Sequence, residues 1–227
     1  MATVAGRSAR VGPIVLRRVP YDVYVRLVGE EANDRLRMTY FDGTLEIMSP
    51  ERIHEVPSRR IGLIILAVAS ELGIPCTGTG STTFRRGGEG SFRGKGKEPD
   101  QSFYIEHARW LLEKGEKKLD LDAGDFPPDL WVETDNCGSS KGRLPVYATL
   151  GVPEVWRYRS RKKTLAVLRQ NAQGEYEPIE RSLGLPMLTP DLVLAALAMG
   201  EGELETIRFK RLKEWVRETL APNMDNQ

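Results

Sequence analysis

The chain has 227 residues, of which 40% are hydrophobic, and its 33 basic side chains nearly balance 32 acidic ones. That length is sufficient for one domain with a sizeable core. The formal net charge of +1 excludes recognition of nucleic acid by bulk charge, so such a partner requires a local basic patch. Two cysteines and two histidines without a CxxC spacing argue against a disulfide framework or a structural zinc site. The longest apolar stretch, residues 61–72, is too short to span a bilayer, and we expect a cytoplasmic protein without membrane contact.

Apolar periodicity and turn residues predict short helices and strands that follow one another without a repeat. In the first half of the chain we expect a helix over residues 20–29, a hairpin over 35–48, a helix over 56–72, strands over 76–84 and 98–105, and a short helix over 108–114. In the second half we expect a strand over 128–135, a helix over 140–150, strands over 155–158, 164–168 and 176–179, a helix from 190 and a last helix over 203–220. This order predicts an α/β (α+β-like) fold with a mixed central sheet and flanking helices.

Local signals set several boundaries. Residues 1–12 lack periodicity and are expected to be disordered. Pro57 is expected in the first turn of its helix, where the missing N–H costs nothing. Residues 85–97 contain five glycines, five basic residues and one acid, which predicts a mobile basic loop. One domain over residues 13–200 is expected, followed by a C-terminal helix and tail over 201–227.

Acidic side chains on two expected strands are the strongest functional signal. Glu133 and Asp135 are two residues apart, so they point to the same face of a strand. Asp100 joins them if the strand at 98–105 is a neighbour. Converging carboxylates repel one another unless a cation lies between them, and oxygen ligands suit Mg²⁺ or Mn²⁺. The pattern therefore predicts a metal-dependent hydrolase site.

The motifs, taken in order, resemble the putative restriction endonuclease family of the PD-(D/E)XK nuclease superfamily, from about residue 21 to 197. The residues that carry the resemblance are Met48-Ser49-Pro50, His54-Glu55, Glu98-Pro99-Asp100, Val132-Glu133, Tyr147 and the run from Gly151 to Tyr158. The resemblance implies a restriction-endonuclease-like sheet and Mg²⁺- or Mn²⁺-dependent cleavage of nucleic acid. DNA is the expected substrate, and RNA is the alternative.

The resemblance also implies roles for individual residues. Asp100 matches the motif aspartate and Glu133 the acidic residue of the second motif. Asp135 occupies the position that holds lysine in the wider superfamily. In this family the lysine moves to the following helix, where the chain has Arg143, with Lys141 two residues earlier. Arginine keeps its proton and stabilises charge without acting as a base, so Lys141 supplies the ammonium, or Arg143 acts electrostatically, or activity is reduced.

Further expectations concern ligands and partners. Glu55, at the start of the long helix, is a third candidate metal ligand. The basic side chains of residues 85–97 are candidates for phosphate contacts: Arg85, Arg86, Arg93, Lys95 and Lys97. The apolar face of the last helix suggests a homodimer. Two other functions stay open, a nuclease fold that binds nucleic acid without efficient cleavage and a hydrolase of small phosphoesters.

Overall fold

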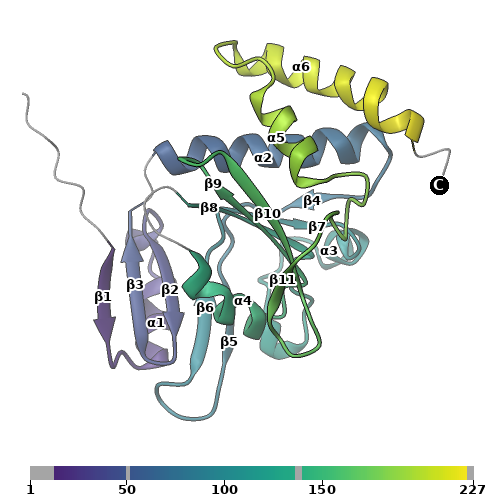
Figure 1. Ribbon diagram of the computed structural model, residues 1–227. Helices are drawn as coiled ribbons and strands as arrows, with labels where there is room; N and C mark the ends of the chain where they lie inside the picture. Colours follow the sequence, from purple (N-terminus) through teal and green to yellow (C-terminus); the bar gives the residue numbers. More distant parts are fainter. Residues whose placement is uncertain (1–12, 50–51, 136–139, 224–227) are drawn as a thin grey trace, which may run out of the picture.

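The computed structural model describes residues 13–49, 52–135 and 140–223 of the chain. Two sheets lie next to each other, with helices around them (Figure 1). The first sheet has the order β1 (Ile14–Arg17), β3 (Thr44–Met48), β2 (Arg37–Phe41), β6 (Gly94–Lys97) and β5 (Phe84–Gly87). The second has the order β11 (Tyr176–Pro178), β10 (Thr164–Gln170), β9 (Glu154–Arg159), β8 (Leu130–Asp135), β7 (Gln101–Tyr104) and β4 (Thr77–Gly78).

The second sheet is mixed. Strands β8 and β9 are parallel, and the other pairs are antiparallel. A parallel pair needs a crossover connection, which here contains a 3₁₀ turn, Ser140–Arg143, and the helix α4 (Leu144–Leu150). The prediction of a mixed sheet flanked by helices is confirmed. The strand expected over 76–84 is wrong in extent, because the only paired residues there are β4 and the first residue of β5.

Two layers of helix cover the second sheet. On one face lies α2 (Arg52–Glu71), and α5 (Pro190–Ala198) and α6 (Glu205–Trp215) pack over it (Figure 1). On the other face α4 lies between the two sheets, against β5 and β6. Side chains alternate along β8, so Val132 joins the core under α2 while Trp131 joins the core around α4. The other α-helices of the described residues are α1 (Tyr21–Val28) and α3 (Ala108–Lys114).

The helix α2 begins earlier than expected. We predicted a start near Val56 with Pro57 in the first turn, but the helix begins at Arg52 and Pro57 lies inside it. A proline this close to the N-terminus removes one intrahelical hydrogen bond. The apolar face farther along the helix is completely buried, at Ile61, Ile65 and neighbouring positions, and that packing offsets the loss.

The segment 85–97 is a hairpin, so the prediction of a mobile loop is wrong. Its two strands, β5 and β6, pair antiparallel, and β6 also pairs with β2. The glycines serve close packing: a Cβ at Gly96 would lie 2.0 Å from the phenol oxygen of Tyr24, and one at Gly94 would lie 2.4 Å from the ring of Tyr21. Both tyrosines belong to α1, so α1 packs directly on the backbone of β6.

The apolar face of the last helix is largely covered within the chain. Leu212, Val216 and Leu220 are buried in the same core as α2. That face is therefore unavailable for the homodimer that the sequence suggested, and only side chains at its margin, such as Leu204 and Ile207, are exposed. Among the described residues, no helix is both long and apolar enough to cross a membrane.

Candidate active site

The candidate site lies where the two sheets meet. Strands β7 and β8 are antiparallel neighbours, with Gln101 opposite Val132. Asp100 immediately precedes β7, and its Oδ2 accepts a hydrogen bond of 2.7 Å from the backbone N–H of Thr134. The two strands are neighbours, which is the condition under which Asp100 was expected to approach the strand that carries Glu133. From the first sheet, β6 ends at Lys97 beside these two acids.

Glu133 is buried in this junction, with an exposed fraction of 3%. Its Oε1 lies 3.4 Å from Lys97 Nζ, yet among the described residues it accepts no hydrogen bond. Burial raises the pKa of Glu133 from 4.5 to about 7, and the charge of Asp100 adds to the rise, while Lys97 and Arg143 oppose it. Among the described residues, Lys97 and Arg143 offset only part of the cost of burying the Glu133 carboxylate.

Lys97 is the basic side chain beside Glu133 whose position the sequence did not reveal. Its exposed fraction is 5%, and its ammonium donates a hydrogen bond of 2.6 Å to the carbonyl oxygen of Glu98. We expected Lys97 on a mobile loop, but the hairpin fixes it against Glu133. The one sequence signal that could have placed it is its position three residues before Asp100, at the end of the strand that leads into the motif.

Arg143 is the last residue of the 3₁₀ turn before α4, and its charge acts on Glu133. It makes an ion pair with Glu46 of β3. Burial opposes the charge of the guanidinium, but the neighbouring Tyr147, Glu133 and Glu46 raise the pKa of Arg143 above its ordinary value. Arg143 is therefore a permanent cation beside the acids. The backbone of Lys141 lies in the preceding 3₁₀ turn, but its side chain is outside the described residues.

Tyr147 adds a hydroxyl to this side of the site. It is fully buried and stacks edge-on against Trp131. Its hydroxyl has no hydrogen-bond partner among the described residues. Burial, together with the charges of Glu133, Asp100 and Asp135, raises the pKa of Tyr147 well above its ordinary value. A buried phenol that stays neutral is therefore part of the surroundings of Glu133.

Asp135 departs from the expected convergence of three carboxylates. It forms a buried ion pair with Arg157 on the parallel strand β9, with 2.9 Å between Arg157 Nη2 and Asp135 Oδ2. In the described part of the chain, Asp100, Glu133 and Asp135 do not gather within 4.8 Å. Asp135 is instead paired with Arg157 at the strand end. A catalytic role for Asp135 stays a prediction.

Glu55 belongs to a network at the margin of the site. Its carboxylate lies 3.6 Å from Arg37, whose guanidinium also lies 3.5 Å from Glu98. Glu98 is largely buried and accepts a hydrogen bond of 3.0 Å from Thr83, and burial raises its pKa. The network holds the N-terminus of α2 against the motif strand, and metal binding by Glu55 stays a prediction.

A second acidic group lies at the other end of β7. Glu106, His107 and Asp129 offer ligand atoms within 4.8 Å of one another. The oxygens of Asp129, however, already accept hydrogen bonds from the backbone N–H groups of Ile105 and His107, and one lies 2.6 Å from the His107 ring nitrogen. These contacts fix the turn from β7 into α3, so we interpret this group as structural.

The other basic side chains of the hairpin face different surroundings. Lys95 and Arg93 lie 2.6 Å and 3.6 Å from the carboxylate of Asp42. Arg86 donates a hydrogen bond of 3.1 Å to the carbonyl oxygen of Thr149, and Arg85 lines a cavity. The hairpin therefore does not present a continuous basic strip, and its contacts with phosphate stay a prediction.

Comparison with known proteins supports the family assignment. Residues 22–200 match the model of a family described as Uma2, putative restriction endonuclease. A search of curated proteins gave no match. Among solved structures, a crystal structure of a putative nuclease of DUF820 from Anabaena variabilis is similar, at 15% identity, with a TM-score of 0.46 and coverage of 79% of this chain and 99% of that chain.

Proposed function

Because the chain belongs to the Uma2 family of putative restriction endonucleases, we propose that it is a metal-dependent endonuclease that hydrolyses phosphodiester bonds in DNA. The observation that carries the proposal is the pair Asp100 and Glu133 on adjacent strands, with the buried ammonium of Lys97 beside Glu133. Two acids and one lysine are the chemical equipment of the PD-(D/E)XK site that the sequence resembles. Here the lysine comes from a different strand.

The acids fit a divalent cation. Among the described residues, Glu133 Oε1 is buried and accepts no hydrogen bond, and the hydrogen bond from Thr134 to Asp100 engages only Oδ2. Carboxylate oxygens are the ligands that Mg²⁺ and Mn²⁺ prefer. When bound, such an ion polarises a phosphate and lowers the pKa of a coordinated water. Glu133 and Asp100 would hold it.

Lys97 and Arg143 would together fill the role that one lysine has in the PD-(D/E)XK site. Lys97 holds its ammonium against Glu133, where it orients a water or stabilises negative charge that builds on phosphate oxygens. Arg143, a permanent cation, would bind a phosphate oxygen once substrate competes with Glu46. The neutral hydroxyl of Tyr147 offers one more donor. RNA remains the alternative substrate.

The experiment is a cleavage assay on supercoiled plasmid and single-stranded DNA with Mn²⁺ or Mg²⁺. We expect nicking by the wild type, loss of at least about a hundredfold in Asp100→Ala and Lys97→Met, and partial retention in Lys97→Arg. Glu106→Ala is the matched control, because Glu106 is exposed and belongs to the other acidic group. Equal loss in Glu106→Ala would contradict the assignment of the site.

A second function is favoured by one specific observation. Arg143, where the family has lysine, is already paired with Glu46, so its charge is partly neutralised before substrate arrives. This supports a weakened nuclease fold that binds nucleic acid without efficient cleavage. Binding of Mn²⁺ by the wild type, measured by calorimetry and lost in Asp100→Ala, together with no cleavage of any polynucleotide, would favour this alternative.

A further inference from the structure

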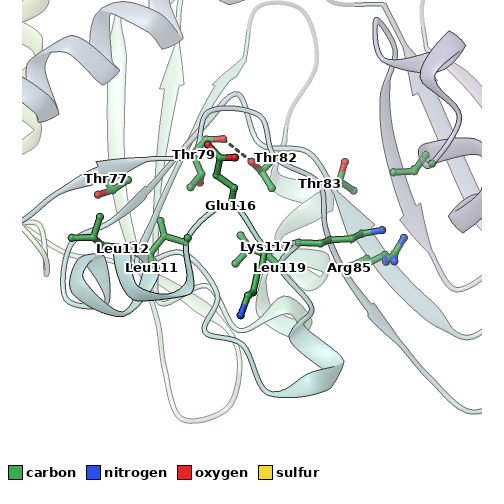
Figure 2. A pocket seen from close by; sticks show the side chains of 14 residues that line it. Thr77, Thr79, Thr82, Thr83, Arg85, Leu111, Leu112, Glu116, Lys117 and Leu119 are labelled. Carbon is green, nitrogen blue, oxygen red and sulfur yellow. Dashed lines mark hydrogen bonds between the residues drawn. The ribbon is translucent and has the colours of Figure 1, made fainter.

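A cavity of about 590 Å³ opens beside the candidate site. It lies between the segment from β4 to β5, the end of α1, and the end of α3 with the loop that follows (Figure 2). Ligand pockets commonly have volumes of roughly 300–1,000 Å³. The cavity adjoins the active-site network through Thr83, which lines it and donates its hydroxyl proton to Glu98, two residues before Asp100.

Two chemically different walls face each other across this cavity. Figure 2 shows Thr79, Thr82 and Thr83 along one side and the leucines of α3 and its following loop along another. Leu112 of that apolar side is 80% exposed. An apolar body that covered it would remove this surface from water, which is favourable in proportion to the area buried.

The threonine wall has a defined hydrogen-bonding polarity. Thr82 donates its hydroxyl proton to the carbonyl oxygen of Thr79 at 2.7 Å, and Thr83 donates to Glu98 at 3.0 Å. Their protons are therefore committed, and their oxygens are left to accept. Such a wall suits a flat apolar body that carries N–H donors on its edge, as the nucleobases do.

Charge at the cavity favours an anion. Its lining includes three cations, Arg85, Lys117 and Lys118, against the single carboxylate of Glu116. Among the described residues none of these three cations has a carboxylate within ion-pair distance, and Lys117 and Lys118 are exposed. Uncompensated cations beside an apolar wall match a ligand with a phosphate at one end and an apolar ring at the other.

We infer that this cavity is a nucleotide-binding site, with the base between the leucines and the threonines and the phosphate at Arg85, Lys117 and Lys118. The nucleotide that we expect there belongs to the DNA strand near the scissile phosphate, and in this respect the inference rests on the proposed function. A free nucleoside monophosphate has the same chemistry and is the other source.

The test measures binding without metal, so that it does not depend on cleavage. In EDTA, dAMP binding is followed by calorimetry and binding of a fluorescent 12-nucleotide single strand by anisotropy. The variants are Lys117→Ala/Lys118→Ala and Leu112→Ala, all at exposed positions that should not affect folding. The matched control is Lys162→Ala/Lys163→Ala, on the exposed turn between β9 and β10.

We expect at least about a fivefold loss of affinity in the cavity variants and none in the control. Weakening of both ligands supports a nucleotide of the strand, whereas weakening of dAMP alone supports a free nucleotide. Unchanged affinity for both, or no binding of either by the wild type, overturns the inference. Cleavage of DNA with Mn²⁺ is measured separately. If the cavity variants cleave DNA and bind both ligands as the wild type does, only the nucleotide site is refuted. If the wild type binds the ligands but does not cleave DNA, only the nuclease function is refuted.

Discussion

Burial of Glu133 should make the stability of the metal-free protein fall as pH rises. Its pKa is raised from 4.5 to about 7, so between these values the folded state keeps a proton that the unfolded chain has released. Stability then decreases with pH, because the unfolded state binds fewer protons. At about 1.4 kcal/mol per pH unit, the loss attributable to Glu133 amounts to about 3 kcal/mol and is complete by about pH 8.

The assay compares urea unfolding of the wild type and Glu133→Gln in EDTA from pH 5 to pH 8, followed by tryptophan fluorescence. Glutamine does not titrate, so this variant should lack about 3 kcal/mol of the pH-dependent loss. Glu98 and Glu154, whose pKa values are also raised by burial, contribute equally to both proteins. Only the slopes are compared, because the substitution also removes the counter-charge of Lys97.

A divalent cation should reverse this loss. Mn²⁺ at one hundred times its Kd would stabilise the wild type by about 2.7 kcal/mol, and the gain should shrink in Glu133→Gln. Parallel pH dependence in the two proteins would refute the reasoning, since it would mean that Glu133 is hydrated or compensated in solution. If the stability of the wild type falls with pH as expected but Mn²⁺ does not change it, Glu133 is buried as described and is not a metal ligand.

Three further predictions test the surroundings of the site. Gly96→Ala should destabilise the fold by about 2–3 kcal/mol in urea unfolding, because the added Cβ would collide with Tyr24. The control is Gly142→Ala, which has open space around the added Cβ and should change the urea midpoint little. Glu154→Ala should cost about 3–5 kcal/mol in urea unfolding, since it strands an indole N–H and two backbone N–H groups; a smaller loss than 1 kcal/mol would contradict this. Asp129→Ala should lower stability by about 2 kcal/mol yet leave the affinity for Mn²⁺ in calorimetry unchanged.

The strand that follows Asp100 and the strand that carries Glu133 could each be predicted because strand formation left a local pattern. Acidic residues beside apolar and aromatic ones marked two strands, and alternation placed Glu133 and Asp135 on the same face of one of them. The partner of Asp135 could not be predicted in this way. Arg157 reaches it only because β9 is the parallel neighbour of β8, and a non-local pairing of this kind leaves no periodic signal in the chain.

The position of Lys97 was hidden by the composition of its surroundings. A segment rich in glycine and basic residues is typical of a loop, because glycine weakens a strand and adds no packing side chain. In this fold the missing side chains are what allow Tyr24 and Tyr21 to pack on β6. The same glycines that argued for disorder therefore permit the strand that delivers Lys97.

The location of Lys97 ties the chemistry of the site to the docking of the two sheets. Asp100 and Glu133 belong to the second sheet, whereas Lys97 and Glu46 belong to the first. If all its residues came from one sheet, the site would survive loosening of the other sheet. Here, loosening of the first sheet would remove both the ammonium of Lys97 and Glu46, the partner of Arg143. Disturbing the packing of α1 on β6 at Gly96 should therefore reduce cleavage as well as stability.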